Sequence, residues 1–511
     1  MKPVYIVSWL FALAISFVSC DDWLDKTPKD RLYPDVYFKT EDELRLFTNQ
    51  FYNNLVPSAV DIYSESSDLI VKSDLMLEMS GQRIIPDEGN GWNFTALRDI
   101  NFYLQYSHNC TEVNARNRYD GVARFFRAYF YFEKVKRYGD IPWYDKALDS
   151  DDPELYKARD SREFVMQKML EDLDFAIANL PKTKNAYVLT RWTALALKSR
   201  VCLFEGTFRK YHGLEDCEKY LNACVSASET FMNESGYTLY KSGSTPYRDL
   251  FASINLQADE VIFGRDYEAS LSVLHNVQNY ENSTTMGRPG SRFTDKAGYE
   301  TMTFDQECQN RDPRLAQTIR TPGYTRIGST KKEAPNLAYT MTGYHLIKYS
   351  MTANYDEYNK SCNDIPLFRT AEVYLNFAEA KAELGTLKQA DINKSIKLLR
   401  DRVGMTNLDM ELANSKPDPY LMSAATGYPN VKGANQGVIL EIRRERTIEL
   451  AMEGFRYYDI MRWKEGKLFE NDLLGIYVPG PGTYDLDKDG TDDVCFYVGT
   501  KPAGNVPLYL E

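Results

Sequence analysis

Apolar residues recur at helical spacing through much of the chain. The clearest case is the segment 161–180, whose apolar face consists of Met166, Leu170, Leu173, Ile177 and Leu180. Steps of three and four residues place such side chains on one face of an α-helix. Asp160 or Ser161 is suited to cap the first turn, and Pro181 cannot continue the helix. We therefore predict an amphipathic helix over this segment.

Comparable spacing predicts further helices over about residues 121–138, 192–206, 216–232, 367–382 and 392–403. Glycine follows three of these segments, at Gly139, Gly385 and Gly404, where it commonly ends a helix. Helix pairs with alanine and glycine at their contacts and aromatic residues between them are typical of tetratricopeptide-like repeats. No strict period of about 34 residues is visible. We therefore expect a mainly α protein with degenerate or interrupted repeats.

A strongly charged helix is expected over about residues 437–456. Its glutamates recur every four residues, at Glu441, Glu445, Glu449 and Glu453. Like charges at this spacing repel one another, and arginines three residues away offset part of that repulsion. The pattern fits either a solvated charged face or a buried lattice of ion pairs between helices. Apolar residues on an adjoining face, Ile448, Met452 and Phe455, favour docking against other helices.

Composition places the chain among ordinary globular proteins. Of its 511 residues 43% are hydrophobic and 26% charged, which excludes a disordered, collagen-like or coiled-coil chain. The length allows roughly two to four domains or one large compact unit. A formal net charge of −12 argues against a general nucleic-acid binder, which needs a basic surface. Aromatic residues make up 13%, and the 37 tyrosines suit half-wet surfaces as well as cores.

The N-terminus has the features of an export signal. An apolar run over residues 3–19 follows Lys2 and ends at Cys20. A cysteine after a small residue at this place resembles a bacterial lipobox, which implies removal of a signal peptide (residues 1–19) and lipidation of Cys20, with fatty acids such as palmitate. Two or more acyl chains would give stable anchoring. The alternative is an ordinary secretory signal with an incidental cysteine.

Metal and disulfide chemistry has little support in the sequence. Seven further cysteines are an odd number spread along the chain, and no CxxC pair occurs. Asp485, Asp487 and Asp489 with Gly490 have the spacing of a calcium loop, but Phe496 stands where the bidentate glutamate belongs. We expect a β-hairpin turn at this place, with no metal and no cofactor.

Enzyme motifs are also missing from the sequence. It has no GxSxG elbow, HExxH, Walker A or Rossmann glycine pattern. A catalytic interpretation would depend on carboxylate pairs, as in glycosidases, and such pairs occur by chance among 73 acidic residues.

Ordered motifs along the chain carry a family resemblance. They are CDDWLDKTP at 20–28, RAYFY at 127–131, YGDIP at 138–142, WTALALKSRV at 192–201, RDPRL at 311–315, PLFRTAEVYL at 366–375 and the segment from Glu445 to Trp463 that contains ER, EL and EGFR. Together with the lipobox, these motifs resemble those of the SusD/RagB family of surface lipoproteins of Bacteroidota.

The resemblance implies a tetratricopeptide-like helical-repeat scaffold with an irregular, loop-rich, ligand-facing half. In a single SusD-like domain, residues 20–511, we place the helical segments at about 100–232 and 365–465 and the loop-rich insert at about 264–345. The implied function is non-catalytic binding of glycans at the cell surface and their delivery to a TonB-dependent, SusC-like outer-membrane β-barrel. The alternatives are a peptide-binding surface lipoprotein of the same uptake type and a surface glycosidase.

Loop aromatics are the candidate ligand contacts, since sugar rings stack on flat aromatic side chains. Trp92 lies in the glycine-containing loop Gly81–Thr95, with Arg83, Asn90 and Asn93 near it to meet hydroxyl groups. Long loops in compact proteins commonly carry function. The loop-rich insert adds the aromatic candidates Tyr280, Phe293 and Tyr299. For each ring, the alternative is that it folds back onto the protein.

Overall fold

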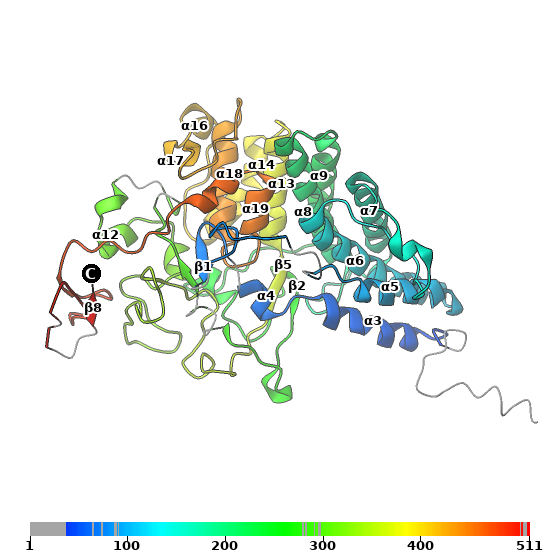
Figure 1. Cartoon of the computed structure of the whole chain (residues 1–511), viewed down its shortest axis with the longest axis horizontal. Coiled ribbons are helices and arrows are strands. Elements are labelled where there is room, and N and C mark those ends of the chain that lie inside the picture. The colour runs from blue at the N-terminus through cyan, green and yellow to red at the C-terminus, as the bar shows by residue number, and fades with distance from the viewer. Residues whose placement is uncertain are drawn as a thin grey trace, which may run out of the picture.

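The computed structural model describes residues 37–63, 66–72, 75–85, 89, 91–277, 281, 284–290, 292–294, 298–500, 502–503 and 508–510. Within these residues a helical half lies beside a loop-rich half (Figure 1). No helix in this part of the chain is both long and apolar enough to cross a membrane.

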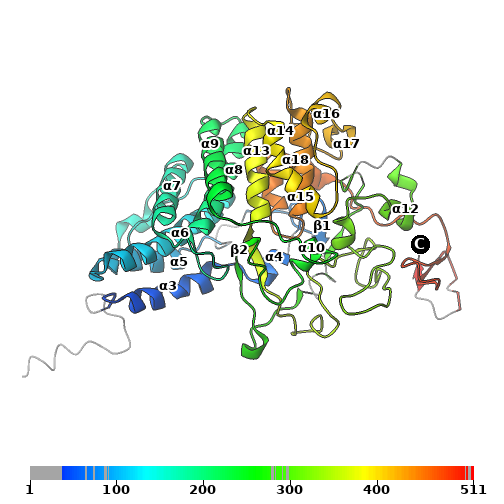
Figure 2. The same cartoon turned by 180° about the vertical axis from the view of Figure 1, so that it is seen from behind.

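The helical half is one array built from two distant parts of the chain. Its main helices are α3 (Glu41–Leu55), α5 (Thr95–Tyr106), α6 (Val113–Tyr138), α7 (Arg162–Asn179), α8 (Arg191–His212), α9 (Cys217–Glu234), α13 (Thr370–Glu383), α18 (Gln436–Glu449) and α19 (Arg456–Arg462). Helix α6 packs against α7, α7 against α8, and α8 against α9. α13 contacts α8, α9 and α18, so the array continues across the intervening loops (Figures 1 and 2).

Local sequence signals account for several helix ends. The Ser161 hydroxyl accepts a hydrogen bond from the backbone of Phe164 at the start of α7, as predicted. Thr190 forms a capping box with Thr193 at the start of α8. Gly206 allows α8 and α9 to approach closely, because a Cβ atom there would lie 2.7 Å from the Leu221 side chain. The predicted amphipathic helices 161–180 and 216–232 are thereby confirmed.

Several of the predicted helices have different bounds in the structure, among them 192–206, which as α8 continues to His212. Residue 367 belongs to a strand, because Pro366 cannot enter a helix interior and the chain stays extended to Arg369. The predicted helix 392–403 is two short ones, α14 (Gln389–Asn393) and α15 (Ile396–Arg402). The charged helix ends at Glu449 and not near residue 456, since Met452 and Gly454 both adopt positive φ. Helix α6, by contrast, begins earlier than predicted, at Val113.

The charged residues of α18 are buried except Glu441, which is half-buried. Arg314 contacts Glu445 at 2.7 Å and Glu449 at 2.9 Å. Arg369 contacts Glu449 at 2.6 Å and Glu453, just beyond the helix, at 2.7 Å. All five side chains are largely or fully excluded from solvent. Of the two interpretations of the glutamate pattern, the buried lattice of ion pairs is therefore confirmed.

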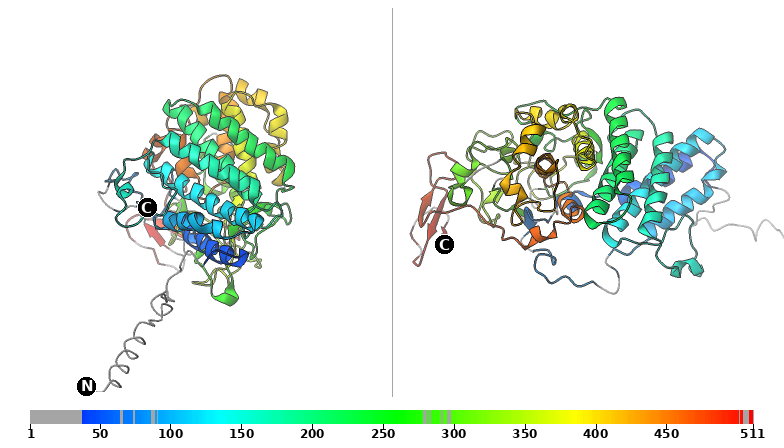
Figure 3. Two further views of the ribbon diagram at one scale, coloured as in Figure 1. Left: turned by 90° about the vertical axis from the view of Figure 1, so that its right-hand side faces the viewer. Right: turned by 90° about the horizontal axis from the view of Figure 1, so that it is seen from above.

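The loop-rich half contains short strands and helices. An antiparallel sheet joins β1 (Ile70–Lys72), β3 (Thr284–Met286) and β4 (Tyr344–His345), and β2 (Val261–Arg265) pairs with β5 (Ile365–Arg369). A C-terminal sheet of β6 (Gly482–Tyr484), β7 (Val494–Tyr497) and β8 (Leu508–Leu510) lies at the opposite end of the molecule from α5–α7 (Figure 3). The other helical segments are α4 (Ala59–Tyr63), α10 (Pro246–Asp249), α12 (Phe304–Cys308), α16 (Met410–Ser415), α17 (Pro419–Met422), η2 (Ser107–Asn109), η3 (Pro153–Tyr156), η4 (Ala269–Leu271), η5 (Tyr299–Thr301), η6 (Leu315–Gln317) and η7 (Gly466–Glu470).

Candidate functional site

The loop between β1 and α5 lies against the C-terminal end of α6. Lys134 of α6 donates a hydrogen bond to the carbonyl oxygen of Gly91. A Cβ atom on Gly91 would lie 3.2 Å from Arg137 and Tyr138, and its φ is +85°, so glycine is suited to this close approach. This contact fixes the position of the next residue, Trp92.

Trp92 presents a half-exposed aromatic ring. Its ring centroid lies 4.9 Å from that of Tyr138 and 5.3 Å from that of Phe94, both in edge-on geometry. The side chain is 38% exposed, and the guanidinium carbon of Arg159 lies 4.9 Å from the ring centroid. Perpendicular ring contacts and the guanidinium over the ring therefore hold Trp92 in place, and its exposed part is available for stacking on a flat apolar surface.

Arg83 lies close to α19. It forms a 2.8 Å salt bridge with Glu78, and the Tyr457 hydroxyl lies 3.5 Å from the same carboxylate oxygen. The rings of Tyr457 and Tyr458 meet edge-on at 5.2 Å. Burial raises the pKa of Tyr458, and the charges of Arg137 and Arg83 are close enough to act on it. The loop and the ends of α6 and α19 therefore share one surface. We call it the Trp92 face, defined by Arg83, Trp92, Tyr138, Arg159, Tyr457 and Tyr458.

A cavity of about 260 Å³ borders this face. Its aromatic walls are Phe125, Phe126, Tyr129, Phe132, Phe204, Phe263, Phe368, Phe455 and Tyr458. The hydroxyls of Tyr129 and Tyr458 form no hydrogen bond with another described residue. Burial raises the pKa of both phenols, so both are protonated at neutral pH and can donate to a ligand.

The other predicted ligand residues differ in their surroundings. The Asn93 side-chain oxygen accepts a 2.8 Å hydrogen bond from the backbone N–H of Thr95, although the residue is exposed beside Trp92. Phe293 is 0% exposed within the core of the loop-rich half, so its ring offers no face to a sugar and we withdraw it as a candidate. Tyr299 is half-buried and faces Tyr420, with ring centroids 6.0 Å apart. Cys20, Asn90 and Tyr280 lie outside the described residues.

Three tyrosines of the Trp92 face were not among the sequence-predicted ligand residues. Tyr138 opens the YGDIP motif, and Tyr457 and Tyr458 are adjacent within the charged C-terminal motif. One signal was available for the last two: on a short helix, neighbouring residues point about 100° apart, so both cannot enter the same core. One of the pair was therefore expected to reach a surface or a cavity.

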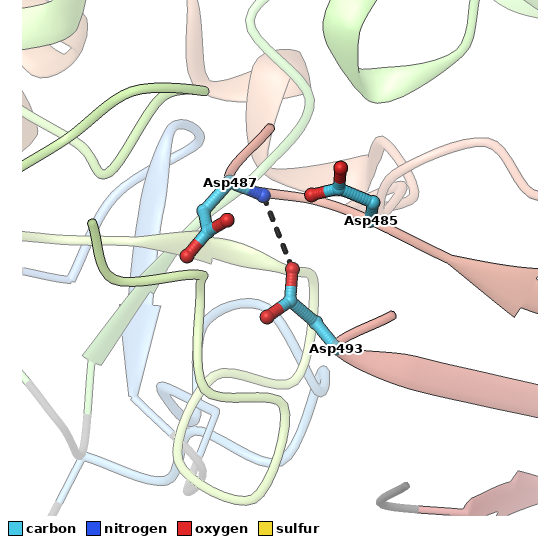
Figure 4. A group of neighbouring side chains, drawn as sticks. All are labelled: Asp485, Asp487 and Asp493. Carbon is cyan, nitrogen blue, oxygen red and sulfur yellow. Dashed lines mark hydrogen bonds between the residues drawn. The ribbon is translucent and has the colours of Figure 1, made fainter. Parts of the chain in front are cut away.

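An acidic turn joins β6 to β7 (Figure 4). Ligand oxygens of Asp485, Asp487 and Asp493 all lie within 4.8 Å of one another, and oxygen ligands suit a hard divalent cation. Asp493 also accepts hydrogen bonds from the backbone of Leu486 and Asp487, at 2.7 and 3.1 Å. The predicted hairpin is confirmed, and that it binds no metal stays a prediction.

The structure combines a helical-repeat scaffold, a loop with a half-exposed tryptophan and an aromatic cavity that borders the same face. Residues 225–494 match the model of the SusD family, and residues 82–191 match a model described as "Starch-binding associating with outer membrane". The first match covers more than half of the chain, which therefore belongs to the SusD family.

Relatives with similar sequences cover nearly the whole chain. SusD-like protein P2 of Formosa agariphila is 26% identical over 496 residues, which span 91% of this chain and 90% of the relative. SusD-like protein P25 of the same organism is 22% identical over 525 residues, which span 91% of this chain and 90% of that relative.

Solved structures share the fold. A SusD-like protein from Bacteroides fragilis aligns with a TM-score of 0.66 at 23% identity, over 86% of this chain and 90% of that one. A SusD-like carbohydrate binding protein from the same species gives 0.66 at 19% identity, over 84% and 88% of the two chains. A structure with a xylogluco-oligosaccharide gives 0.57 at 18% identity, over 83% and 82%. The predicted mainly α, tetratricopeptide-like fold is thereby confirmed.

Proposed function

We propose that this protein binds oligosaccharides at the Trp92 face and delivers them, chemically unchanged, to a TonB-dependent outer-membrane transporter. The observation that carries the proposal is the half-exposed Trp92 ring, held by a perpendicular contact with Tyr138 and with the Arg159 guanidinium over it. The matched model is described as starch-binding and associating with the outer membrane, and structural neighbours include a carbohydrate binding protein and a complex with a xylogluco-oligosaccharide.

The carboxylates at this surface support binding without catalysis. Glycoside hydrolysis uses two carboxyl groups on either side of the scissile bond, one as acid and one as base or nucleophile. Beside the Trp92 face, Glu78 is paired with Arg83 at 2.8 Å, and Glu133, which lines the adjoining aromatic cavity, is paired with Lys136 at 2.7 Å. Both carboxylates are thus engaged by cations of the protein itself.

Replacing Trp92 tests the proposed site. Trp92→Ala is expected to weaken oligosaccharide binding by on the order of 2 kcal/mol, about thirty-fold, because a stacking platform is lost. The melting temperature should change little, since a half-exposed ring leaves no closed cavity. Binding would be measured by calorimetry, with the glycan first chosen from a polysaccharide panel and a peptide library screened in parallel.

A matched control separates stacking from a general loss of exposed aromatic surface. Tyr358 is 75% exposed in the loop-rich half, and Tyr358→Ala should leave binding unchanged. Wild-type affinity of Trp92→Ala would eliminate Trp92 from the site. Lost binding with a large drop in melting temperature would assign the ring a structural role, and selective binding of peptides would favour the peptide-uptake alternative.

We further propose that the protein is held at the outer face of the outer membrane by lipids on Cys20. The apolar run that ends at this cysteine motivates the proposal. Cys20→Ala is expected to abolish labelling by a fatty-acid analogue and to release the protein from the membrane fraction. Equal membrane association of the variant and the wild type would contradict it. Cys110→Ala, which changes a buried cysteine, serves as the control.

A further inference from the structure

A second cavity lies where α8 ends and α19 passes into η7. Its volume is about 880 Å³, and it shares no lining residue with the aromatic cavity at the Trp92 face. Three segments contribute to it: the end of α8, the loop 424–432 and residues 464–470. The Trp92 face is not involved, so ligand binding at this second cavity does not depend on the proposed function.

Lysines gather around this cavity. Lys210, Lys432, Lys464 and Lys467 all line it. Lys210 is paired with Glu383 at 2.7 Å, but the other three are exposed and form no salt bridge with another described residue. Three unpaired ammonium groups around a concave surface repel one another, and such a cleft focuses positive potential. This is notable in a chain whose net charge is −12.

The carboxylates that line the cavity, Glu465 and Glu470, form no salt bridge with these three lysines within the described part of the chain. Glu465 is buried, accepts a 3.1 Å hydrogen bond from the backbone of Asn430, and lies 3.7 Å from Nη1 of Arg443. Burial raises the pKa of Glu465 to about 7, so much of its negative charge is absent at neutral pH. Glu470, at the rim, is exposed to solvent.

A buried guanidinium behind the cavity wall adds to the positive charge. Arg443 is 0% exposed and stacks on Tyr211, a lining residue, with 4.7 Å from its guanidinium carbon to the ring centroid. Its Nη2 atom donates a 3.4 Å hydrogen bond to Glu383, whereas its Nε and Nη1 atoms have no hydrogen-bond acceptor among the described residues. A fully buried cation with unsatisfied donors is stabilised by any negative charge brought nearby.

We infer that this cavity is a binding site for a small ligand that carries an oxyanion, such as a sulfate, phosphate or carboxylate group on a sugar. Lys432, Lys464 and Lys467 supply charged donors that can turn toward such a group. The concave shape favours a small ligand over a flat anionic surface. The site would act in addition to the Trp92 face and would give the protein a preference for acidic saccharides.

Four monosaccharides test the inference by calorimetry on the purified protein. Glucose 6-sulfate, glucose 6-phosphate and glucuronic acid present the anion, and glucose is the neutral control. We expect at least one of the anionic sugars to bind at low salt and to bind more weakly at high salt, while glucose does not bind at this cavity. Failure of all three anions to bind, or equally tight binding of glucose, would overturn the inference.

Matched triple variants locate the site. Changing Lys432, Lys464 and Lys467 together to glutamine is expected to weaken binding of the anion by at least about tenfold, because three charged donors are lost. The control changes Lys182, Lys241 and Lys331 to glutamine; these lysines are also exposed, form no salt bridge within the described part of the chain, and lie elsewhere. It alters net charge equally and should keep wild-type affinity. Equal losses in both would overturn the inference.

Single lysine variants and Trp92→Ala distinguish loss of the anion site from unfolding and from binding at the Trp92 face. Should the first triple variant melt at a lower temperature, the single variants Lys432→Gln and Lys467→Gln replace it, each with an expected loss of roughly two- to threefold. Trp92→Ala should bind the anionic monosaccharides as the wild type does. A loss of anion binding in Trp92→Ala alone would place the anion at the Trp92 face and overturn the second site.

Discussion

Arg369→Met is expected to lower the free energy of unfolding by about 3–5 kcal/mol, the scale found when one partner of a buried ion pair is removed. Arg369 is 2% exposed and lies between three glutamates. Its nitrogens contact Glu260 at 3.0 Å, Glu449 at 2.6 Å and Glu453 at 2.7 Å. Methionine fills much of the same volume but leaves three buried carboxylates with fewer cations.

Urea unfolding followed by circular dichroism measures this effect. Arg118→Met is the matched control, because Arg118 forms a 3.4 Å pair with Glu41 in which both side chains are nearly half exposed. Exposed pairs contribute less than about 1 kcal/mol, so the control should unfold almost as the wild type does. If Arg369→Met unfolds at the same urea concentration as Arg118→Met, the lattice does not stabilise this fold.

Acid is expected to unfold the protein through buried carboxylates that are paired with arginines, two of which, Glu449 and Glu453, contact Arg369. The groups concerned are Asp68, Glu379, Glu449, Glu453 and Asp459. Burial alone would raise the pKa of each, but neighbouring arginines outweigh burial and lower it. The folded state therefore binds fewer protons than the unfolded state at mildly acidic pH. Their contribution is complete above the ordinary carboxyl pKa of about 4 and is lost as the pH falls through the lower, folded values.

Other buried carboxyl groups act in the opposite direction, and the pKa of Glu281 is raised furthest among them. Burial raises the pKa of Glu281 to about 8, although the Ser350 hydroxyl and the backbone of Tyr349 donate hydrogen bonds to it. A raised carboxyl pKa favours the folded state at low pH, and this contribution is lost as the pH rises from about 4.5 to about 8. Stability should therefore fall on both sides of a maximum in the weakly acidic range.

Melting temperatures measured from pH 2 to pH 9 test this dependence. We expect the melting temperature to fall on the acid side as these buried carboxylates take up protons. In Glu281→Gln the decline on the alkaline side should become shallower, while the acid side stays unchanged. A melting temperature that stays level from pH 6 down to pH 2 would contradict the role given to the lattice.

Short-range signals in the sequence were sufficient for the helices and for the class of fold. The faces of α7, α8 and α9, the caps at Ser161 and Thr190, and the close contact at Gly206 all depend on residues within a few turns. Such patterns can be recognised in the amino-acid sequence, because helix periodicity and capping depend on residues that are close together in the chain. The predictions failed where tertiary context changed the backbone, as at β5, whose antiparallel partner β2 lies about a hundred residues earlier.

The sequence alone also pointed to Trp92 and Arg83, because a tryptophan among glycines is poorly suited to a core. Only the tertiary structure showed that their loop meets Tyr138, Tyr457 and Tyr458, and that Phe293 is buried. In the same way, the glutamates of α18 were visible as a pattern, but their partners Arg314 and Arg369 lie far away in the chain. Pairing across such distances depends on how the helices pack, and no local spacing of residues encodes it.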